Sequence, residues 1–303
     1  MTAPGARLRH AITAAAADGR TMSFLGVYDV FSASLAAERS EALFLSGFGF
    51  AASHYGLPDI GFISWTDMVD FAARIRTVLP AHHLLVDIDD GYCDVEVACH
   101  VAERLERAGT SGVVLEDQRR PRRCGHFDGK QIMELDDFLL KLERVLAARD
   151  ELFVVARTDA TDPAEAARRA RAFAAAGADA VLIDGVRDLA LLRGLAPELG
   201  RPLFFNQIAG GKSPRCTLGE LRRSGVTGAI YSTPCLFAAQ MAIEAALDAL
   251  GADDGRLPAP GPGRVGVADC TAVLQRNLER RGRRSHPAEP VPEPAALVLD
   301  TDG

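Results

Sequence analysis

Two clusters of carboxylates follow short apolar runs, and such clusters can hold a hard divalent cation. The first is LLVDIDDGY at residues 84–92, and the second is VVLEDQ at residues 113–118. Magnesium ions in proteins take one or two carboxylates directly, keep several waters, and bind substrate oxygens at the remaining positions. A single acid at such a place more commonly caps a helix or solvates a loop. Three acids together, Asp87, Asp89 and Glu116, favour metal binding, and the lack of Cys and His in the cluster disfavours zinc and copper.

A basic segment, RRPRRCGHFDGK at residues 119–130, comes directly after the second cluster. Positive charge beside a thiol lowers its pKa, so Cys124 is a candidate acid or base, with Arg122 and His126 as candidate catalytic neighbours. The alternative is an inert buried thiol in a solvated basic loop. Loops on the catalytic face of an enzyme often close over the substrate and exclude water, which favours the functional interpretation.

The elements that must position these residues alternate regularly along the chain. Short runs rich in Val, Ile, Leu and Phe are separated by segments of helical periodicity, as in βα units on a parallel sheet. Eight strands are predicted, at residues 24–28, 42–46, 84–87, 112–116, 152–157, 180–183, 203–206 and 229–231. Helices are predicted between them, at residues 95–108, 136–148, 163–176 and 189–199. Eight such units predict an α/β fold, a closed (β/α)8 TIM barrel whose strand ends meet on one catalytic face.

The chain divides into three predicted parts. Residues 1–252 form the catalytic barrel, residues 253–284 form a linker and a C-terminal helix at 270–281, and residues 285–303 form a polar, proline-rich tail that we expect to be disordered.

Composition excludes several classes of protein. The net charge of −7 argues against nucleic-acid binding, which needs a basic surface. No apolar run reaches the length of about 18 residues that would span a bilayer, and the N-terminus lacks a signal-peptide core. We therefore expect a cytoplasmic protein without membrane partners. The six cysteines lack CxxC spacing, so neither a disulfide framework nor a zinc cluster is indicated.

Five ordered motifs carry a resemblance to a known superfamily. They are GVYDVFSASLAAERSEALFLSGFGFAASHYGLPDIG, VDIDDGY, LEDQRRPRRCGH, ARTDA and NQIAGGKSP, and they span roughly residues 20 to 250. Together they resemble the isocitrate lyase and phosphoenolpyruvate mutase superfamily. The most specific element is LED followed by RCGH, which is similar to the KKCGH or KRCGH signature of the lyases.

The resemblance implies a set of site residues and a cofactor. Asp87 would be the direct ligand of Mg2+, with Mn2+ as the alternative, and Asp59, Asp89 and Glu116 would hold its waters. Cys124 would be the acid or base of the lyase branch. The residues that would meet the substrate are Tyr28, Ser46, Gly47, Arg157, Asp184 and Asn206. Family members are homo-oligomers, commonly tetramers, that exchange a C-terminal helix, so we expect a tetramer or dimer in which residues 270–281 are that helix.

The implied activity is carbon–carbon cleavage of a small 2-hydroxy or 2-keto dicarboxylate through an enolate, giving pyruvate or glyoxylate. Candidate substrates resemble 2-methylisocitrate or 2,3-dimethylmalate. One alternative is a phosphonomutase or phosphonopyruvate hydrolase, although no phosphate-binding motif is present. A second is a noncatalytic homologue that binds metal and carboxylate.

Several departures from the family pattern fall on functional positions. Arg122 stands where lysine is usual, and a guanidinium cannot act as a base because it does not deprotonate in proteins. Asp184 and Ala209 each replace a common glutamate, and Asp90 and Cys93 alter the usual DTGYG. These changes predict a substrate other than the standard one.

Overall fold

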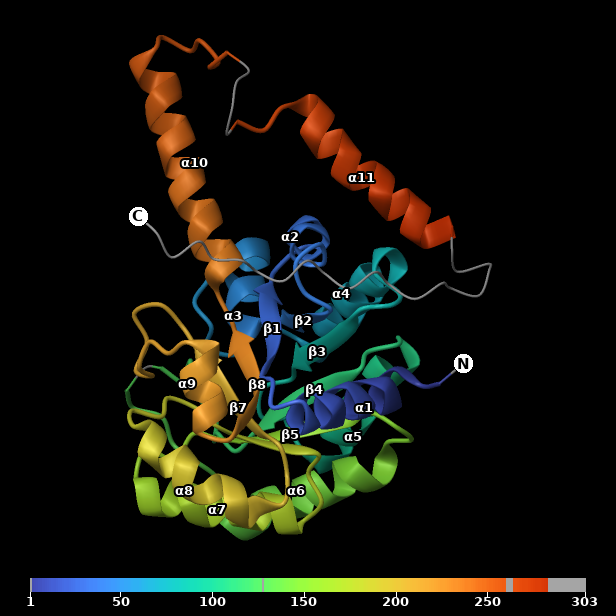
Figure 1. The fold of residues 1–303 in the computed structure, drawn as a ribbon, viewed down its shortest axis with the longest axis vertical. Coiled ribbons are helices and arrows are strands. Elements are labelled where there is room, and N and C mark those ends of the chain that lie inside the picture. Colours follow the sequence, from blue (N-terminus) through green and yellow to red (C-terminus); the bar gives the residue numbers. More distant parts are fainter. Residues whose placement is uncertain (1, 127, 260–263, 283–303) are drawn as a thin grey trace.

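Eight parallel strands form a closed barrel in chain order, with β8 pairing back onto β1 (Figure 1). The computed structural model describes residues 2–126, 128–259 and 264–282. The strands are β1 Met22–Val27, β2 Ala42–Leu45, β3 His83–Asp87, β4 Gly112–Glu116, β5 Phe153–Thr158, β6 Ala180–Ile183, β7 Leu203–Gln207 and β8 Val226–Tyr231. All eight predicted strands and the predicted barrel are confirmed, with boundary shifts of a few residues.

Helices surround the barrel, and most of them follow a strand. They are α1 Pro4–Ala17, α2 Val30–Ala36, α3 Gly47–Phe50, the π-helix η1 Ala51–Tyr55, α4 Trp65–Val78, α5 Val95–Arg107, α6 Leu135–Ala148, α7 Pro163–Ala175, α8 Leu189–Leu199, α9 Leu218–Arg223, α10 Pro234–Ala252 and α11 Val267–Gly282. The four helices predicted between strands correspond to α5, α6, α7 and α8. The predicted C-terminal helix is α11, which begins three residues earlier than expected.

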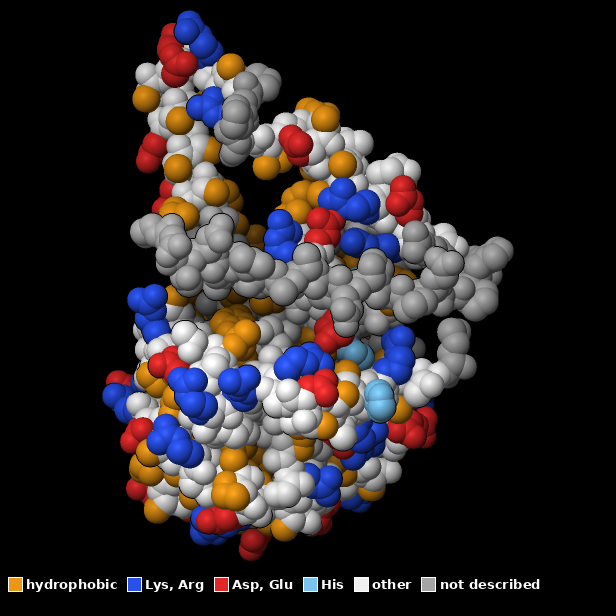
Figure 2. Space-filling view, viewed as in Figure 1, with side chains coloured by type: hydrophobic (Ala, Val, Ile, Leu, Met, Phe, Trp, Pro, Cys, Tyr) orange, Lys and Arg blue, Asp and Glu red, His pale blue; other side chains and the backbone are white. Residues whose placement is uncertain are grey.

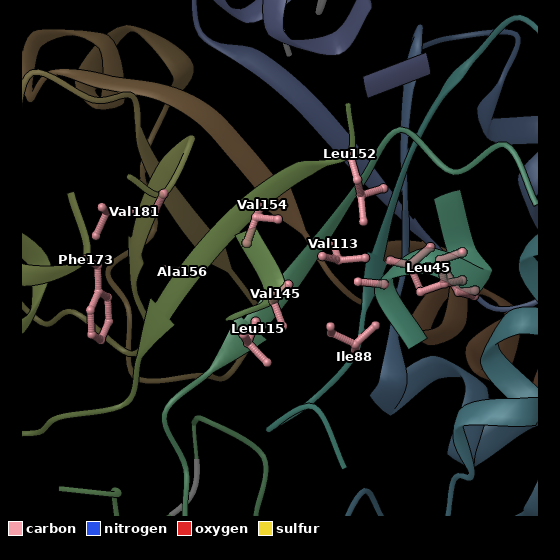
Figure 3. Close-up of a cluster of buried hydrophobic side chains, with 14 of the residues drawn as sticks. Leu45, Ile88, Val113, Leu115, Val145, Leu152, Val154, Ala156, Phe173 and Val181 are labelled. Carbon is pink, nitrogen blue, oxygen red and sulfur yellow. The ribbon is translucent and has the colours of Figure 1, made fainter. Parts of the chain in front are cut away.

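Apolar side chains form two separate layers, because successive residues of a strand point to opposite sides of the barrel wall. The outer layer lies between strands and helices, where Val154 of β5 and Val113 of β4 lie near Val145 of α6 (Figure 3). The inner layer fills the barrel with side chains such as Phe24, Phe153 and Phe204. Strands buried on both sides read as continuous apolar runs, which explains why the sequence revealed them.

Helix α1 contributes to this inner layer. Its Leu8 and Ile12 side chains are buried with Phe24 and Phe153 in the barrel core. The core is therefore packed with side chains, and the carboxyl ends of the strands remain available for a site.

The C-terminal arm leaves the barrel. Helix α10 projects away from β8, and α11 returns beside α2 and α4 (Figure 1). Asn277 of α11 is buried and donates a hydrogen bond from Nδ2 to Ser34 Oγ of α2 at 2.8 Å. None of the residues of α10 is buried, and hydrophobic side chains run along this arm (Figure 2).

Helix α10 is apolar in composition although none of its residues is buried. Its 19 residues are long and apolar enough, by length and composition, to pass as a membrane-spanning helix, whereas we expected no such segment. Its acidic residues, Glu244 and Asp248, interrupt the apolar run and hid it from a search for uncharged stretches. The predicted disordered tail, residues 285–303, lies outside the described residues.

Candidate active site

A narrow cavity opens where the carboxyl ends of the strands meet. Six strands deliver a polar residue to it from their last two positions or from the position directly after the strand. These residues are Ser46, Asp87, Arg157, Asp184, Asn206 and Ser232. The segment after β4 supplies Arg122, Cys124, Gly125 and His126. The cavity volume is about 30 Å³.

The four predicted metal-site acids lie together beside this cavity. Asp59, Asp87, Asp89 and Glu116 are all at most 7 % exposed. The guanidinium of Arg122 lies among them: its Nη1 contacts Asp59, its Nη2 lies 3.1 Å from Asp89 Oδ1, and its Nε lies 3.1 Å from Glu116 Oε1. The structure thus brings together the residues that the sequence assigned to the metal.

These acids fit a divalent cation that is bound directly by one carboxylate. Among the described residues, no three Asp, Glu, His or Cys side chains converge into a complete ligand set. Asp87 accepts one hydrogen bond, from the Asp89 backbone N–H at 3.2 Å. No described residue forms an ion pair with Asp87. A single direct carboxylate with water-holding neighbours is the arrangement that Mg2+ commonly takes.

The excess of buried negative charge in the site also favours a bound cation. Three cations, Arg122, Arg157 and Lys130, face six buried carboxylates. These carboxylates are Asp59, Asp87, Asp89, Glu116, Asp159 and Asp184.

The pKa shifts of the metal-site acids reflect this excess of carboxylates. Burial raises the pKa of Asp89 to about 8, and the neighbouring Asp87 and Asp59 add to the rise against the opposing effect of Arg122. Burial likewise raises the pKa of Asp87 and of Glu116. A cation in this cage of acids would lower all three again.

Arg157 also lines the cavity and pairs with several buried carboxylates. Its guanidinium pairs with Glu116 Oε2 at 3.1 Å, Asp159 Oδ2 at 2.9 Å and Asp184 Oδ2 at 2.8 Å. Burial would raise the pKa of Asp184, but Arg157 and His126 hold it below its usual range. Asp184 is therefore ionised at neutral pH.

A chain of hydrogen bonds fixes the polar groups beyond Asp184. Asn206 donates from Nδ2 to Asp184 Oδ1 at 2.9 Å and accepts at Oδ1 from the Ser232 hydroxyl at 2.6 Å. The Lys212 backbone N–H donates to His126 Nδ1 at 2.9 Å. Because Nδ1 accepts, a neutral His126 carries its proton on Nε2, which lies 3.5 Å from Asp184 Oδ1.

Cys124 differs from the sequence-based expectation. We predicted a thiol pKa lowered by neighbouring cations. Instead, burial raises the pKa of Cys124 to about 11, and the Asp184 and Asp59 carboxylates add to the rise against Arg157 and the His126 backbone N–H. The adjacent Arg123 is exposed, and Arg122 turns its charge to three carboxylates. The thiol is therefore protonated at neutral pH and suited to donate a proton.

Of the predicted substrate residues at the ends of β1 and β2, Ser46 lines the cavity and Tyr28 does not. Ser46 caps α3, lines the cavity, and accepts a hydrogen bond from the Gly49 N–H at 3.2 Å. A Cβ on Gly47 would lie 3.2 Å from Asp87 Oδ2, so this glycine leaves space beside the proposed metal ligand. Tyr28 is partly buried next to Gly49 and does not line the cavity.

Sequence reasoning missed two polar residues of the site, Lys130 and Ser232. Lys130 ion-pairs with Asp159 at 2.6 Å, and both side chains are buried. Lys130 belongs to the basic segment, but its sequence neighbours gave no sign of this partner. Ser232 directly follows β8, so the same rule that selected polar residues at the other strand ends would have found it.

Three of the departures from the family pattern lie away from the cavity. Asp90 receives two hydrogen bonds from Arg120, at 2.8 and 2.7 Å, and Cys93 is exposed. Neither residue lines the cavity, and neither does Ala209. Arg122 and Asp184 are therefore the departures that can act directly on the chemistry.

A family model and several curated relatives match most of this chain. The model of the phosphoenolpyruvate phosphomutase family matches residues 13–250. A 2-methylisocitrate lyase of Bacillus subtilis (strain 168) is 35 % identical over 225 residues, which cover 72 % of this chain and 73 % of the relative. A 2,3-dimethylmalate lyase of Eubacterium barkeri is 28 % identical over 237 residues, covering 76 % of this chain and 81 % of the relative.

Solved structures agree with these relatives. A crystal structure of 2,3-dimethylmalate lyase superposes with a TM-score of 0.85 at 26 % identity, covering 94 % of this chain and 96 % of the other. An oxaloacetate acetylhydrolase in complex with 3,3-difluorooxalacetate superposes with a TM-score of 0.84 at 30 % identity, covering 94 % and 99 %.

Proposed function

Because this chain belongs to the phosphoenolpyruvate phosphomutase family, within the isocitrate lyase/PEP mutase superfamily, we propose that it is a Mg2+-dependent carbon–carbon lyase. The observation that carries the proposal is a protonated, buried thiol, Cys124, which lines the same cavity as the carboxylate Asp87. The substrate is a small 2-hydroxy or 2-keto dicarboxylate, and the product is pyruvate, glyoxylate or a related keto acid.

Asp87 would hold the cation directly, with Asp59, Asp89 and Glu116 holding its waters. Once bound, Mg2+ supplies Lewis-acid stabilisation for the negative charge that develops as the carbon–carbon bond breaks. Mn2+ offers the same ligand preference for oxygen.

The residues of the chain position the substrate and move the proton. Arg157 lies close enough to line the cavity, and its fixed positive charge stabilises a carboxylate or developing enolate there. Asn206, oriented by Asp184 and Ser232, presents its amide to the same space. Bond cleavage leaves an electron pair on carbon, and Cys124 donates the thiol proton to it.

Residues 124–126 exclude water from this step. Cys124, Gly125 and His126 are all buried against the strand ends. A proton donor sealed from solvent protonates the carbanion once and protects the enolate from side reactions.

An assay with a substrate panel tests the proposal. The purified protein would be incubated with Mg2+ and branched 2-hydroxy and 2-keto dicarboxylates, oxaloacetate, and phosphonopyruvate. Keto acids and oxalate would be followed by mass spectrometry, and phosphorus species by NMR. Release of a keto acid or oxalate that stops on chelation of the metal supports the lyase, whereas turnover of phosphonopyruvate alone would assign the phosphonomutase or hydrolase branch.

We also propose a homo-oligomer, either a tetramer or a dimer. Helix α10 exposes Met241, Ile243 and Leu247 at 58 to 68 % of their surface. Large exposed apolar side chains on an unburied helix are typical of a surface that packs against another copy of the chain. The sequence assigned the exchange to residues 270–281. In this structure α11 rests on α2 and α4, whereas α10 contacts β1 and has no buried residue. A cytoplasmic location stays a prediction from the sequence.

A further inference from the structure

A second pocket lies on the face of the barrel opposite the candidate active site. His83, which lines it, is the first residue of β3, whereas Asp87 of the candidate active site is the last residue of the same strand. Helix α1 covers this face through contacts with β4, β5 and β8. The pocket volume is about 540 Å³, which is enough for a small organic molecule. We call it the amino-face pocket, and its lining is Thr2, Arg7, His10 and His83 together with three alanines.

The ionisable side chains that line the amino-face pocket are all basic. Arg7 and His10 lie three residues apart on α1, so they share one side of the helix, and His83 comes from β3. Among the described residues, no Asp or Glu lines the pocket. The chain as a whole has a net charge of −7, so a concave surface with only basic groups is a local exception. Such a surface attracts anions.

Arg7 has no acidic partner among the described residues. Its side chain is partly buried, and its Nε is shielded from solvent with no hydrogen-bond partner in that part of the chain. Arg9, on the same helix, differs, because it pairs with Asp179 at 3.0 Å and with Glu151 at 3.2 Å. Carboxylate and phosphate oxygens are the partners that a guanidinium binds most strongly. An anion in the pocket would give Arg7 the partner that Asp179 and Glu151 give Arg9.

His83 lies in an equally positive environment. The charged groups that act on it are Arg7 of α1, Arg76 of α4 and the adjacent His82. Burial, with a further contribution from these basic groups, lowers the pKa of His83 to about 4. The imidazole is therefore neutral at neutral pH, and it keeps one N–H that can donate a hydrogen bond. Its Nδ1 has no hydrogen-bond partner among the described residues.

We propose that the amino-face pocket binds a small anion, with Arg7 as its counter-ion and His10 and His83 as hydrogen-bond partners. The ligand is a small molecule that carries a phosphate or carboxylate group, since a guanidinium pairs with either group through two parallel N–H donors. Alanine side chains of the lining leave space for the rest of the molecule. The inference is independent of the proposed lyase activity, because the two pockets share no residue.

Chemical modification of histidine tests the site. Diethylpyrocarbonate acylates accessible neutral imidazoles, and mass spectrometry of the peptides gives the rate at each histidine. Inorganic phosphate and malonate are the probes, each compared with sodium chloride at the same ionic strength. We expect at least one probe to slow the modification of His10 and His83 saturably, with no effect on the exposed His100. Protection by phosphate alone indicates a phosphorylated ligand, and protection by malonate alone indicates a carboxylate.

Variants of Arg7 test the assigned counter-ion. In Arg7→Gln the half-protecting concentration of the anion should rise at least about tenfold, as for loss of a charge-assisted hydrogen bond. Arg20→Gln makes the same change of charge just beyond α1, on an exposed side chain, and should behave like the wild type. Arg7→Lys keeps the charge without the planar fork and should fall between them. A wild type that neither anion protects, or an unchanged half-protecting concentration in Arg7→Gln, would overturn the proposal.

A second variant decides the matter if thermal unfolding shows that Arg7→Gln does not fold. Ala81 lines the pocket, and Ala81→Glu adds a carboxylate that would pair with Arg7 and repel the anion. We expect this variant to lose the protection of His10, and protection at the wild-type level would contradict the site. His126 lines the candidate active site and reports binding there. Protection of His126 without His10 would therefore place the anion in the active site and refute the amino-face pocket.

Discussion

Gly125 lies so close to Asp184 that a Cβ added to the glycine would fall 1.8 Å from Asp184 Oδ2 and 2.3 Å from Arg157 Nη2. Only a residue without a side chain allows the backbone beside Cys124 to rest on the Arg157 and Asp184 ion pair. The contact of Gly125 with Asp184 and Arg157 therefore sets the position of the neighbouring Cys124 relative to these two charged side chains.

Substitution of Gly125 should move Cys124 away from Asp184. Gly125→Ala must displace either the Cys124 backbone or the Asp184 carboxylate, and a displacement of this size should lower kcat/KM by about 10- to 100-fold. Steady-state kinetics measure the effect. Gly194→Ala is the matched control, because a Cβ there meets nothing within 4 Å; equal kinetics for the two variants would show that the close approach is unimportant.

Asp87 should carry the metal affinity. Asp87→Asn removes the one acid of the cage without an ion pair among the described residues, and we expect Mg2+ or Mn2+ to bind at least about tenfold more weakly, as seen for losses in metal coordination shells. Isothermal titration calorimetry, or Mn2+ binding followed by EPR, gives the affinity without turnover. The control is Asp94→Asn, which changes charge equally at the N-cap of α5, where asparagine caps as well. Unchanged binding in Asp87→Asn would place the metal elsewhere.

The thiol pKa gives a pH prediction with a definite sign. Burial raises the pKa of Cys124 to about 11, so the folded protein keeps the thiol protonated through neutral pH and loses its proton only as pH approaches that value. Labelling of Cys124 by iodoacetamide should therefore keep rising with pH up to about 11 in the metal-free protein. A labelling rate already at its plateau near neutral pH would mean a thiolate, and would restore the lowered pKa that the sequence suggested.

The exposed helix α10 should hold the oligomer together. Met241→Glu with Leu247→Glu places two charges on its apolar surface, and we expect the protein to shift to monomers, because burial of unpaired charges in an interface is costly. Size-exclusion chromatography with light scattering reports the mass. Gln240→Glu adds a charge to an already polar residue of the same helix and serves as the control. A monomeric wild type would contradict the assigned role of α10.

The sequence predicted the barrel well because its strands are buried on both sides and punctuated by polar residues. Asp87, Glu116 and Arg157 could be found from this rule, since each stands at or near a strand end. The same rule would have led to Ser232. It could not show that Lys130 reaches Asp159, or that Arg122 enters the acid cage, because both contacts join segments far apart in the chain.

The direction of the Cys124 pKa illustrates the limit most clearly. Its neighbours in the chain are cations, and the sequence therefore indicated a lowered pKa. In three dimensions Arg122 faces Asp59, Asp89 and Glu116, Arg123 faces solvent, and the thiol itself is buried. Burial and side-chain direction, which the sequence does not display, decide whether the pKa of Cys124 is raised or lowered.

Helix α10 was missed for a simpler reason. Its residues were included in the predicted barrel, which we expected to end at residue 252. Whether an alanine-rich apolar helix packs on the barrel or leaves it depends on tertiary contacts that local periodicity does not encode.

The central claim is that Cys124 donates a proton to the carbanion left by carbon–carbon cleavage. The most direct measurement compares the wild type with Cys124→Ser at saturating Mg2+, using the substrate that the panel identifies and following keto-acid release. We expect kcat to fall by at least about 100-fold, as for loss of a general acid, with Mg2+ affinity unchanged and Cys93→Ser fully active. A serine variant that cleaves at the wild-type rate would contradict the account and remove Cys124 from the chemistry.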